Sequence, residues 1–362
     1  MHHPQSDNHP LRFDNRDISR YNGGERRQPM RGFDPQYTDI VDYIIRITHK
    51  IWEEKAVGYI YDTYQHNCVV HGSGADIHGR EAVVASTVQS LAACPDDRTY
   101  GMDVIWSGNE DDGFHTSHLI TGTATNSGWS RYGPPTGRKL VWHTIANCLA
   151  KENMIFEEWL LRDETSVIRQ MGLDVHTIVE QQARELLAQG VPEEPAGEIG
   201  PTRGQHAPTM RPLGTVGVFD VEDFVRTTYQ EVWNRRMFNV ITQRYAASHV
   251  CAMTGGRTLH GQAELISFVL NLLGMFPDAE VTVDHVYWNG DDTQGYRVAV
   301  RWTLSGTHSG FGVYGIPSMA RVRIMGLSHH HVRHGTFHKE YTIFDEMEIL
   351  RRIAVRRLMA SV

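Results

Sequence analysis

Apolar positions recur at helical spacing near the start of the chain and at strand spacing further along. A helix predicted over residues 37–55 carries one apolar face, formed by Ile40, Tyr43, Ile44 and Ile47. Two shorter helices are predicted over 57–64 and 79–93. Alternating and β-branched runs then predict four long strands, over residues 98–108, 113–124, 137–149 and 154–162.

The same order of elements returns in the second half of the chain. Helices are predicted over 220–236, 238–246 and 261–274, and strands over 279–289, 295–307, 319–332 and 336–344. A shift of 182 residues places His78 on His260 and Glu158 on Glu340. An offset sustained over about a hundred residues indicates two copies of one domain, not a solenoid of short repeats.

Helices followed by long antiparallel strands predict an α+β domain, with the helices packed on one face of a curved sheet. Four segments follow from this pattern. They are an extended arm over 1–35, a first domain over 36–189 closed by a helix at 174–189, a Pro/Gly-rich linker over 190–217, and a second domain over 218–362.

Composition narrows the possible partners. The formal net charge is −8 and no block of Lys or Arg stands out, so we expect no nucleic-acid partner. Neither a membrane-spanning apolar run nor a signal peptide is visible, which favours a cytoplasmic protein without a membrane partner. The four cysteines form no CxxC pair and are expected to be buried thiols.

A group of motifs in the first copy forms a recognisable pattern. Residues 133–138 have the sequence GPPTGR, and Trp159, Asp163 and Gly172 follow further along the chain. This pattern resembles the SnoaL-like polyketide cyclase family, within the NTF2-like superfamily. The resemblance covers residues 37–175 well and 220–353 more weakly, since the second copy loses the PPTGR element.

The resemblance implies two cone-shaped α+β barrels in tandem, each with a deep pocket closed by helices. Cyclases of this type use an Asp and a His for an intramolecular aldol closure without a cofactor. The superfamily also contains isomerases, dehydratases and plain binding modules. The fold therefore leaves the function open.

The last hairpin of each copy suggests which side chains face the pocket. Lys151-Glu152-Asn153 and Arg333-His334-Gly335 are predicted to be three-residue loops, which puts odd-numbered residues of both strands on one face. The family resemblance places Trp159 and Asp163 in the pocket, so this odd-numbered face is expected to be the inner one. A two-residue turn would move one strand's set to the other face.

On that face we predict two acid/base pairs, Asp163 with His143 and Asp345 with His331. Predicted substrate-binding residues are Trp159, Tyr341, Asn147, His329 and His71. A carboxylate in an apolar cone has its pKa raised, which suits proton abstraction near neutral pH. The competing interpretation is that each Asp caps the helix that follows it and that each His is a satisfied, buried side chain.

Metal binding is the other chemistry to weigh. On a strand His329 and His331 face the same way, and with Asp345 they would make a three-ligand set. The family works without metal, and 21 histidines make coincidence easy. We therefore predict neither a metal nor a cofactor.

Two functional hypotheses remain. The first is a cofactor-independent cyclase, isomerase or dehydratase acting on a small, largely apolar carbonyl or hydroxyl compound. The second is a non-catalytic module that binds a small molecule or scaffolds a partner. Because the copies differ at their polar positions, we expect split roles, with at most one copy binding substrate productively.

The tandem arrangement also suggests an assembly. Domains of this superfamily often pair through the exposed face of the sheet, so we expect an intrachain pseudo-dimer with Trp142 and Ile324 on its outer, contacting face. The chain is then a monomer, or a homodimer formed through the N-terminal arm.

Overall fold

The computed structural model describes residues 24–190 and 219–360. The chain divides into two compact units after Leu173. The predicted arm lies outside the described residues up to position 23, and the predicted linker lies outside them from position 191.

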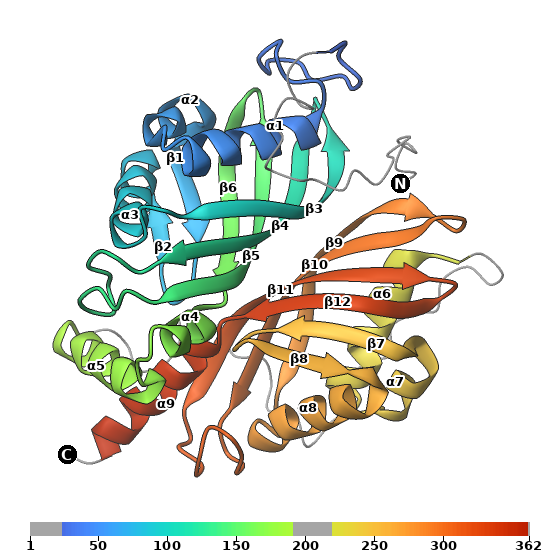
Figure 1. The fold of residues 1–362 in the computed structure, drawn as a ribbon. Helices are drawn as coiled ribbons and strands as arrows, with labels where there is room; N and C mark the ends of the chain where they lie inside the picture. The colour runs from blue at the N-terminus through green and yellow to red at the C-terminus, as the bar shows by residue number, and fades with distance from the viewer. Residues whose placement is uncertain (1–23, 191–218, 361–362) are drawn as a thin grey trace. The chain divides into compact units, whose positions relative to one another are not determined.

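Unit one combines short helices with a six-stranded mixed sheet (Figure 1). Its helical elements are α1 (Ile40–Thr48), η2 (His49–Glu53), η3 (Val57–Tyr59), α2 (Ile60–Thr63), α3 (Arg80–Ala93) and α4 (Glu164–Gln170). Its strands are β1 (Tyr64–His71), β2 (Asp76–His78), β3 (Arg98–Asn109), β4 (Gly113–Thr125), β5 (Lys139–Lys151) and β6 (Met154–Arg162). The strand order is β2-β1-β6-β5-β4-β3, with β1 and β6 parallel and all other neighbours antiparallel.

Unit two repeats this plan. Its helical elements are α5 (Val175–Ala188), α6 (Val221–Tyr229), η4 (Gln230–Asn234), α7 (Asn239–Arg244), α8 (Gly261–Met275) and α9 (Glu346–Ala360). Its strands are β7 (Tyr245–Met253), β8 (Arg257–His260), β9 (Glu280–Asp291), β10 (Gly295–Thr307), β11 (Arg321–Arg333) and β12 (Thr336–Phe344), in the order β8-β7-β12-β11-β10-β9. The matching strand orders confirm the predicted tandem of two α+β domains.

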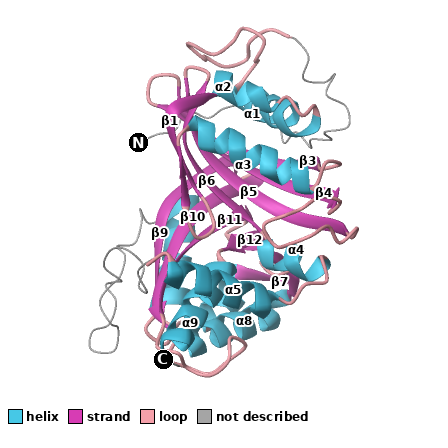
Figure 2. Ribbon diagram, turned by 90° about the vertical axis from the view of Figure 1, so that its left-hand side faces the viewer, coloured by secondary structure: helices cyan, strands magenta, loops and turns pink. Residues whose placement is uncertain are grey.

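The helices cover one face of each sheet. In unit one α1 contacts β3 and β4, and α3 contacts β1 and β2, so both cross the same face (Figure 2). In unit two α6 contacts β9, and α8 contacts β7 and β8. Asp39 and Asp220 begin α1 and α6 in the same way, each accepting a hydrogen bond from the amide three residues later.

Two strands of each sheet were not predicted. β1 and β2 occupy the stretch between Tyr64 and His78, where the two copies differ in length by one residue. Most side chains in the first half of β1 are exposed, so the strand lacks an apolar alternation. Parallel pairing with β6 holds it in place, and this is a long-range contact that local pattern does not report.

The helix predicted at 174–189 exists, but it does not close copy one. α5 belongs to unit two, where it packs against α9. Its buried stripe is Val175, Val179 and Ala183. Helical periodicity predicted this stripe correctly, but it carries no information about which surface covers it.

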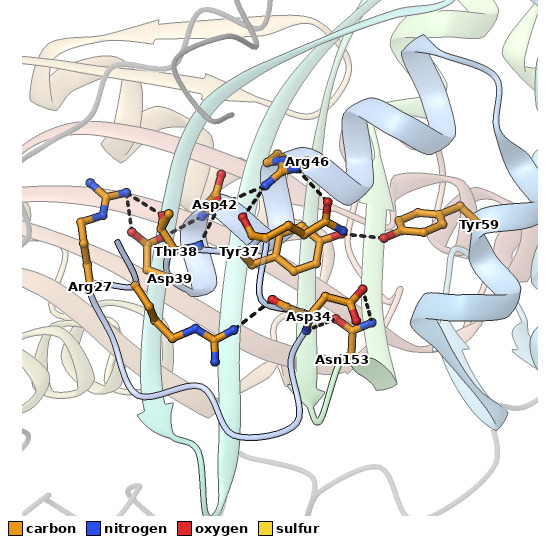
Figure 3. A network of polar contacts seen from close by, with 11 residues as sticks. Arg27, Asp34, Tyr37, Thr38, Asp39, Asp42, Arg46, Tyr59 and Asn153 are labelled. Carbon is orange, nitrogen blue, oxygen red and sulfur yellow. Dashed lines mark hydrogen bonds and ion pairs between the residues drawn. The ribbon is translucent and has the colours of Figure 1, made fainter. Parts of the chain in front are cut away.

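The described part of the arm is built into unit one. Met30, Phe33 and Tyr37 are buried in one cluster with residues of α1, β4 and β6. Figure 3 shows the polar contacts around this cluster. Arg27 pairs with Asp39 at 2.7 Å, just before α1, so segment 24–39 extends the core and does not hang free.

A second set of contacts ties the arm to the tip of the β5–β6 hairpin. The backbone amide of Asp34 donates to Asn153 Oδ1 at 3.3 Å, and Asn153 Nδ2 donates back to the Asp34 carboxylate at 3.2 Å (Figure 3). The Tyr43 hydroxyl donates to the Asn153 carbonyl. The arm and α1 together therefore close the end of the domain where this hairpin turns.

The hairpin turns are shorter than predicted. Lys151 pairs with Met154 and Arg333 pairs with Thr336, so each turn has two residues, not three. Both turn residues have positive φ: Glu152 and Asn153 in copy one, and His334 and Gly335 in copy two. This is the type I′ geometry, whose twist matches that of the flanking strands.

A β-bulge follows each turn and compensates for the missing residue. Beyond the bulge Asn147 pairs with Trp159, and His329 pairs with Tyr341. Odd-numbered residues of both strands therefore do share a face, as predicted, although the turn that produces this register is different.

One close approach fixes the loop after β4 and after β10. Gly128 lies over the end of α3, and its amide donates to the Ala93 carbonyl at 3.0 Å. A Cβ at this position would lie 1.9 Å from the Ala92 carbonyl oxygen. Gly310 in copy two would meet the Gly274 carbonyl oxygen at 1.8 Å. Only glycine permits this approach.

We predict that Gly128→Ala destabilises the protein by about 1–3 kcal/mol, because the loop must move away from α3. Gly58→Ala is the matched control, since a Cβ there meets nothing within 4 Å, and its effect should stay within about 0.5 kcal/mol. Urea denaturation of both variants checks this. Equal effects at the two positions would contradict the steric argument.

Candidate functional site

Unit one encloses a cavity of about 140 Å³ between its sheet and its helices. Apart from Ile155, which lies between the turn and the β-bulge, the side chains that line it from the last hairpin are even-numbered: Trp142, Thr144, Ala146, Cys148, Glu158, Leu160 and Arg162. The opposite wall comes largely from α1, η2 and α3. A cavity of this size is comparable to one that holds a single aromatic ring.

The odd-numbered face of the hairpin, which was expected to line the pocket, therefore lies on the side of the sheet away from the cavity. Alternation correctly predicted which residues share a face, but the choice between the two faces came from placing Trp159 and Asp163 in the pocket. Trp142 was predicted to lie on the outer face and instead lines the cavity. Ile324, its counterpart in copy two, is buried on the same even-numbered face. The predicted outer contact through these two residues is wrong.

Glu158 is the acidic group on the cavity wall from β6. Its carboxylate accepts a hydrogen bond from the Tyr64 hydroxyl at 2.9 Å, and no ion pair reaches it within the described residues. Burial raises the pKa of Glu158 from 4.5 to about 7, and the bond from Tyr64 opposes this only in part. Near neutral pH the group can therefore both accept and donate a proton.

His118 lies on β4 in the same wall. Its strand partner Ala146 pairs in turn with Leu160, two residues from Glu158. On a flat sheet this spacing puts the Cα atoms of His118 and Glu158 roughly 12 Å apart. Burial lowers the pKa of His118 to about 4, so the ring is neutral at pH 7. Its buried Nε2 has no hydrogen-bond partner.

The predicted catalytic aspartates have another role. Asp163 accepts a hydrogen bond from the Ser166 amide and caps α4, and Asp345 accepts one from the Glu348 amide at the start of α9. Neither lines the cavity of its unit. The alternative interpretation, that each Asp is a helix cap, describes their geometry.

Their predicted histidine partners differ in placement. The amide of Asp163 donates to the His143 carbonyl, so these two residues are adjacent, but the His143 ring bonds to Thr121 on the outer face. His331 pairs with Lys339, six residues before Asp345, which is roughly 20 Å along the strand. That separation excludes a His331–Asp345 dyad.

The predicted substrate-binding residues also lie on the outer faces. Trp159 stacks on His71, with ring centroids 5.4 Å apart, and His71 Nε2 contacts Glu157 at 2.9 Å. Asn147 accepts a hydrogen bond from Ser117. In copy two Tyr341 pairs with His329, and neither lines the cavity. These residues were assigned to the pocket because the odd-numbered face of the hairpin was taken to be the inner one.

Unit two has a smaller cavity of about 30 Å³, which leaves room for about two water molecules. Apart from Met253, its lining residues stand at positions that also line the cavity of unit one, but several are larger. Tyr229, Phe268, Trp302 and Phe344 stand where unit one has Thr48, Ser86, Ile120 and Arg162. Larger side chains fill the space in unit two.

The glutamate is kept in unit two but its neighbours change. Glu340 Oε2 lies 3.5 Å from His330 Nδ1 and 3.6 Å from His249 Nε2. Burial raises the pKa of Glu340 to about 7 and lowers the pKa of His330 to about 3. Of the three consecutive histidines, the middle one thus faces inward. Within residues 24–190 and 219–360 no group of three His, Cys, Asp or Glu is arranged to hold a metal.

Sequence reasoning missed Glu158, His118 and the role of Tyr64. A usable indication was present, because Glu158 and Tyr64 recur as Glu340 and Tyr245 while their surroundings diverge. His118 does not recur in the second copy, which has Val300 at the equivalent position.

Among the described helices, none is long and apolar enough to span a membrane.

We predict that Glu158→Gln gains stability relative to the wild type as the pH rises. The unfolded carboxyl loses its proton near pH 4.5 and the folded one near pH 7. Wild-type stability therefore falls across this window, and glutamine removes that loss. The relative gain should be on the order of 2–3 kcal/mol between pH 4.5 and pH 7.5.

Chemical denaturation at several pH values measures this gain. Glu157→Gln is the matched control, because that side chain is 40% exposed on the other face of the same strand. A difference between Glu158→Gln and wild type that does not change with pH would contradict the assignment of a buried, weakly acidic carboxyl.

Several solved structures and one sequence-family model are similar to parts of this chain. Among solved structures, similar ones include a candidate SnoaL-like polyketide cyclase from Jannaschia sp. CCS1, which is 20% identical, with 37% of this chain and 90% of that chain covered and a TM-score of 0.34. IdmH, a candidate polyketide cyclase from Streptomyces antibioticus, is 21% identical, with 37% and 98% covered and a TM-score of 0.33.

A SnoaL-like polyketide cyclase from Agrobacterium tumefaciens is 14% identical, with 38% and 99% covered and a TM-score of 0.31. No curated protein matches the chain. The sequence model of SnoaL-like polyketide cyclases matches residues 223–353, in the copy for which the weaker resemblance was expected. The second repeat is thus matched to the SnoaL-like polyketide cyclase family, and the first repeat shares its strand order.

Proposed function

We propose that unit one is a cofactor-independent acid/base enzyme of the cyclase or isomerase type, acting on a small, largely apolar carbonyl compound. The observation that carries this proposal is Glu158, a buried carboxyl with a pKa of about 7 on the wall of a cavity. A general base works best when its pKa lies near the working pH.

The neighbouring groups fit such a reaction. Glu158 in its ionised form removes a proton from the carbon next to the substrate carbonyl. Tyr64 holds one carboxylate oxygen, which leaves the other free for the substrate. His118, in the tautomer with a proton on Nε2, donates a hydrogen bond to the oxygen on which negative charge develops.

We propose a non-catalytic, scaffolding role for unit two. Its cavity of about 30 Å³ excludes a substrate larger than a few atoms, and Trp302 and Phe344 fill the space. The Glu340 cluster then contributes internal polar contacts to the core. This retains the binding or scaffolding hypothesis for one half of the chain only.

We predict that the wild-type protein accelerates exchange of the α-protons of a small ketone such as 2-indanone in deuterated water, followed by proton NMR. Glu158→Gln should reduce this acceleration by about 100-fold or more, because it removes the base. In the wild type the rate should rise with pH through about 7, as Glu158 ionises. Asp163→Asn is the control and should keep most of the rate.

Two outcomes would contradict the proposal. One is a Glu158→Gln variant that exchanges as fast as the wild type. The other is a wild-type protein that gives no exchange above the buffer rate.

We also predict that Ser86→Phe abolishes exchange and ligand binding, because it places in unit one the side chain that fills unit two as Phe268. The converse variant, Phe268→Ser, should cost about 3–5 kcal/mol of stability without adding activity. Exchange rates and melting temperatures of both variants check this. Full activity in a folded Ser86→Phe variant would place the reaction elsewhere.

A further inference from the structure

The cavity of unit one contains a guanidinium group that makes no ion pair within the described residues. Arg162 lines the cavity from the end of β6, four residues beyond Glu158. Its guanidinium lies over the Trp142 ring, 5.2 Å from the centroid. Within the described part of the chain no hydrogen bond or ion pair reaches it, so its N–H donors remain available.

The charge of Arg162 acts on one acidic side chain of the cavity, Asp97. Asp97 also lines the cavity, and its side chain is buried, with Oδ1 lacking a hydrogen-bond partner. Burial raises the pKa of Asp97 to about 6, and the charge of Arg162 only partly opposes this. No ion pair joins the two side chains. Arg162 and Asp97 thus interact through their charges, without a hydrogen bond or an ion pair between them.

The fold does not require either group. At the equivalent positions copy two has Phe344 in place of Arg162 and Ala279 in place of Asp97, and its sheet has the same order and register. A buried or half-buried charge that the fold can replace with apolar side chains costs stability unless something pairs with it. The missing partner is therefore expected to be a ligand.

We propose that the substrate of unit one carries a carboxylate, which pairs with Arg162, while its reacting end lies toward Glu158. This inference rests on the proposed function for the direction of the substrate, but the anion site itself does not. The guanidinium fork matches a carboxylate in a planar, bidentate pair. One cation in an apolar wall suits a singly charged group better than a phosphate dianion.

The spacing sets the length of the substrate. Arg162 and Glu158 lie four residues apart on one strand, roughly 13 Å between Cα atoms. Both side chains reach inward and shorten this gap. An aromatic or alicyclic ring with a short carboxylate-bearing chain spans the remaining distance and fits the volume of about 140 Å³.

Binding of a charged and a neutral probe of the same shape tests the proposal. We would titrate the full chain with 3-phenylpropanoate and with 3-phenylpropanamide at pH 7.5, by isothermal calorimetry. The carboxylate should bind at least about tenfold more tightly than the amide, because hydrogen bonds between a guanidinium and a carboxylate are strengthened by the two charges. Arg162→Met should remove this preference, and Arg162→Lys should retain part of it.

The variant Asp97→Asn is an independent test, in which the affinity for the carboxylate is expected to rise instead of fall. It removes a competing negative charge, so the carboxylate should bind several-fold more tightly than to the wild type. If Arg162 and Asp97 were instead a structural pair, the same variant would lower the melting temperature and leave binding unchanged. Circular dichroism and thermal melting of each variant establish that it is folded.

Equal binding of the two probes by the wild type would overturn the inference, and so would a preference that survives in folded Arg162→Met. Failure of both probes to bind at millimolar concentration would also overturn it. These outcomes are separate from the proposed function, because exchange of 2-indanone, a neutral ketone, depends on Glu158 and does not require an anion site.

Discussion

Desolvation of one carboxyl group is the constraint on which the site depends. Glu158 is held in an apolar wall by a single donor, Tyr64, and the described residues supply no cation to it. A lone buried carboxyl cannot stay fully ionised at neutral pH, so its pKa moves into the range useful for proton transfer. The same burial costs stability above that pKa, which ties the chemistry to the pH dependence of folding.

The two copies of the sheet surround the buried glutamate in different ways. Both copies keep a glutamate at the same place on the last strand, and in both burial raises its pKa to about 7. Unit one leaves open space beside the carboxyl, whereas unit two surrounds it with His330 and His249 and fills the space with Trp302. One backbone therefore supports a cavity in one copy and a polar core in the other.

Divergence between the copies also separates what the fold needs from what it tolerates. Gly128 and Gly310 are identical because a Cβ would collide with the helix end beneath each of them. Arg162 and Phe344 differ although both stand on the same strand position, so packing alone does not select an arginine there. A cation that the fold can do without is better explained by what it binds, which directs attention to the cavity of unit one.

The tandem of two α+β domains, the long strands and the sharing of a face by alternate residues were all predictable from the sequence. These follow from periodicity and from the 182-residue offset, both of which are local or repeated features of the chain. The sequence left helix capping by Asp163 and Asp345 open as the alternative to catalysis, and the hydrogen bonds from the Ser166 and Glu348 amides fit that alternative.

The face of the sheet that encloses the cavity and the packing of α5 became known only from the three-dimensional structure. Both faces of the last hairpin carry apolar side chains, so alternation gives no preference between them, and a family motif was used to choose. As a result, Trp159 was predicted to line the cavity and Trp142 to lie on the opposite face, whereas the structure has Trp142 in the cavity wall. Which face the helices cover depends on contacts between segments far apart in the chain, and that is why the placement of Glu158 and His118 on the cavity wall emerged only with the fold.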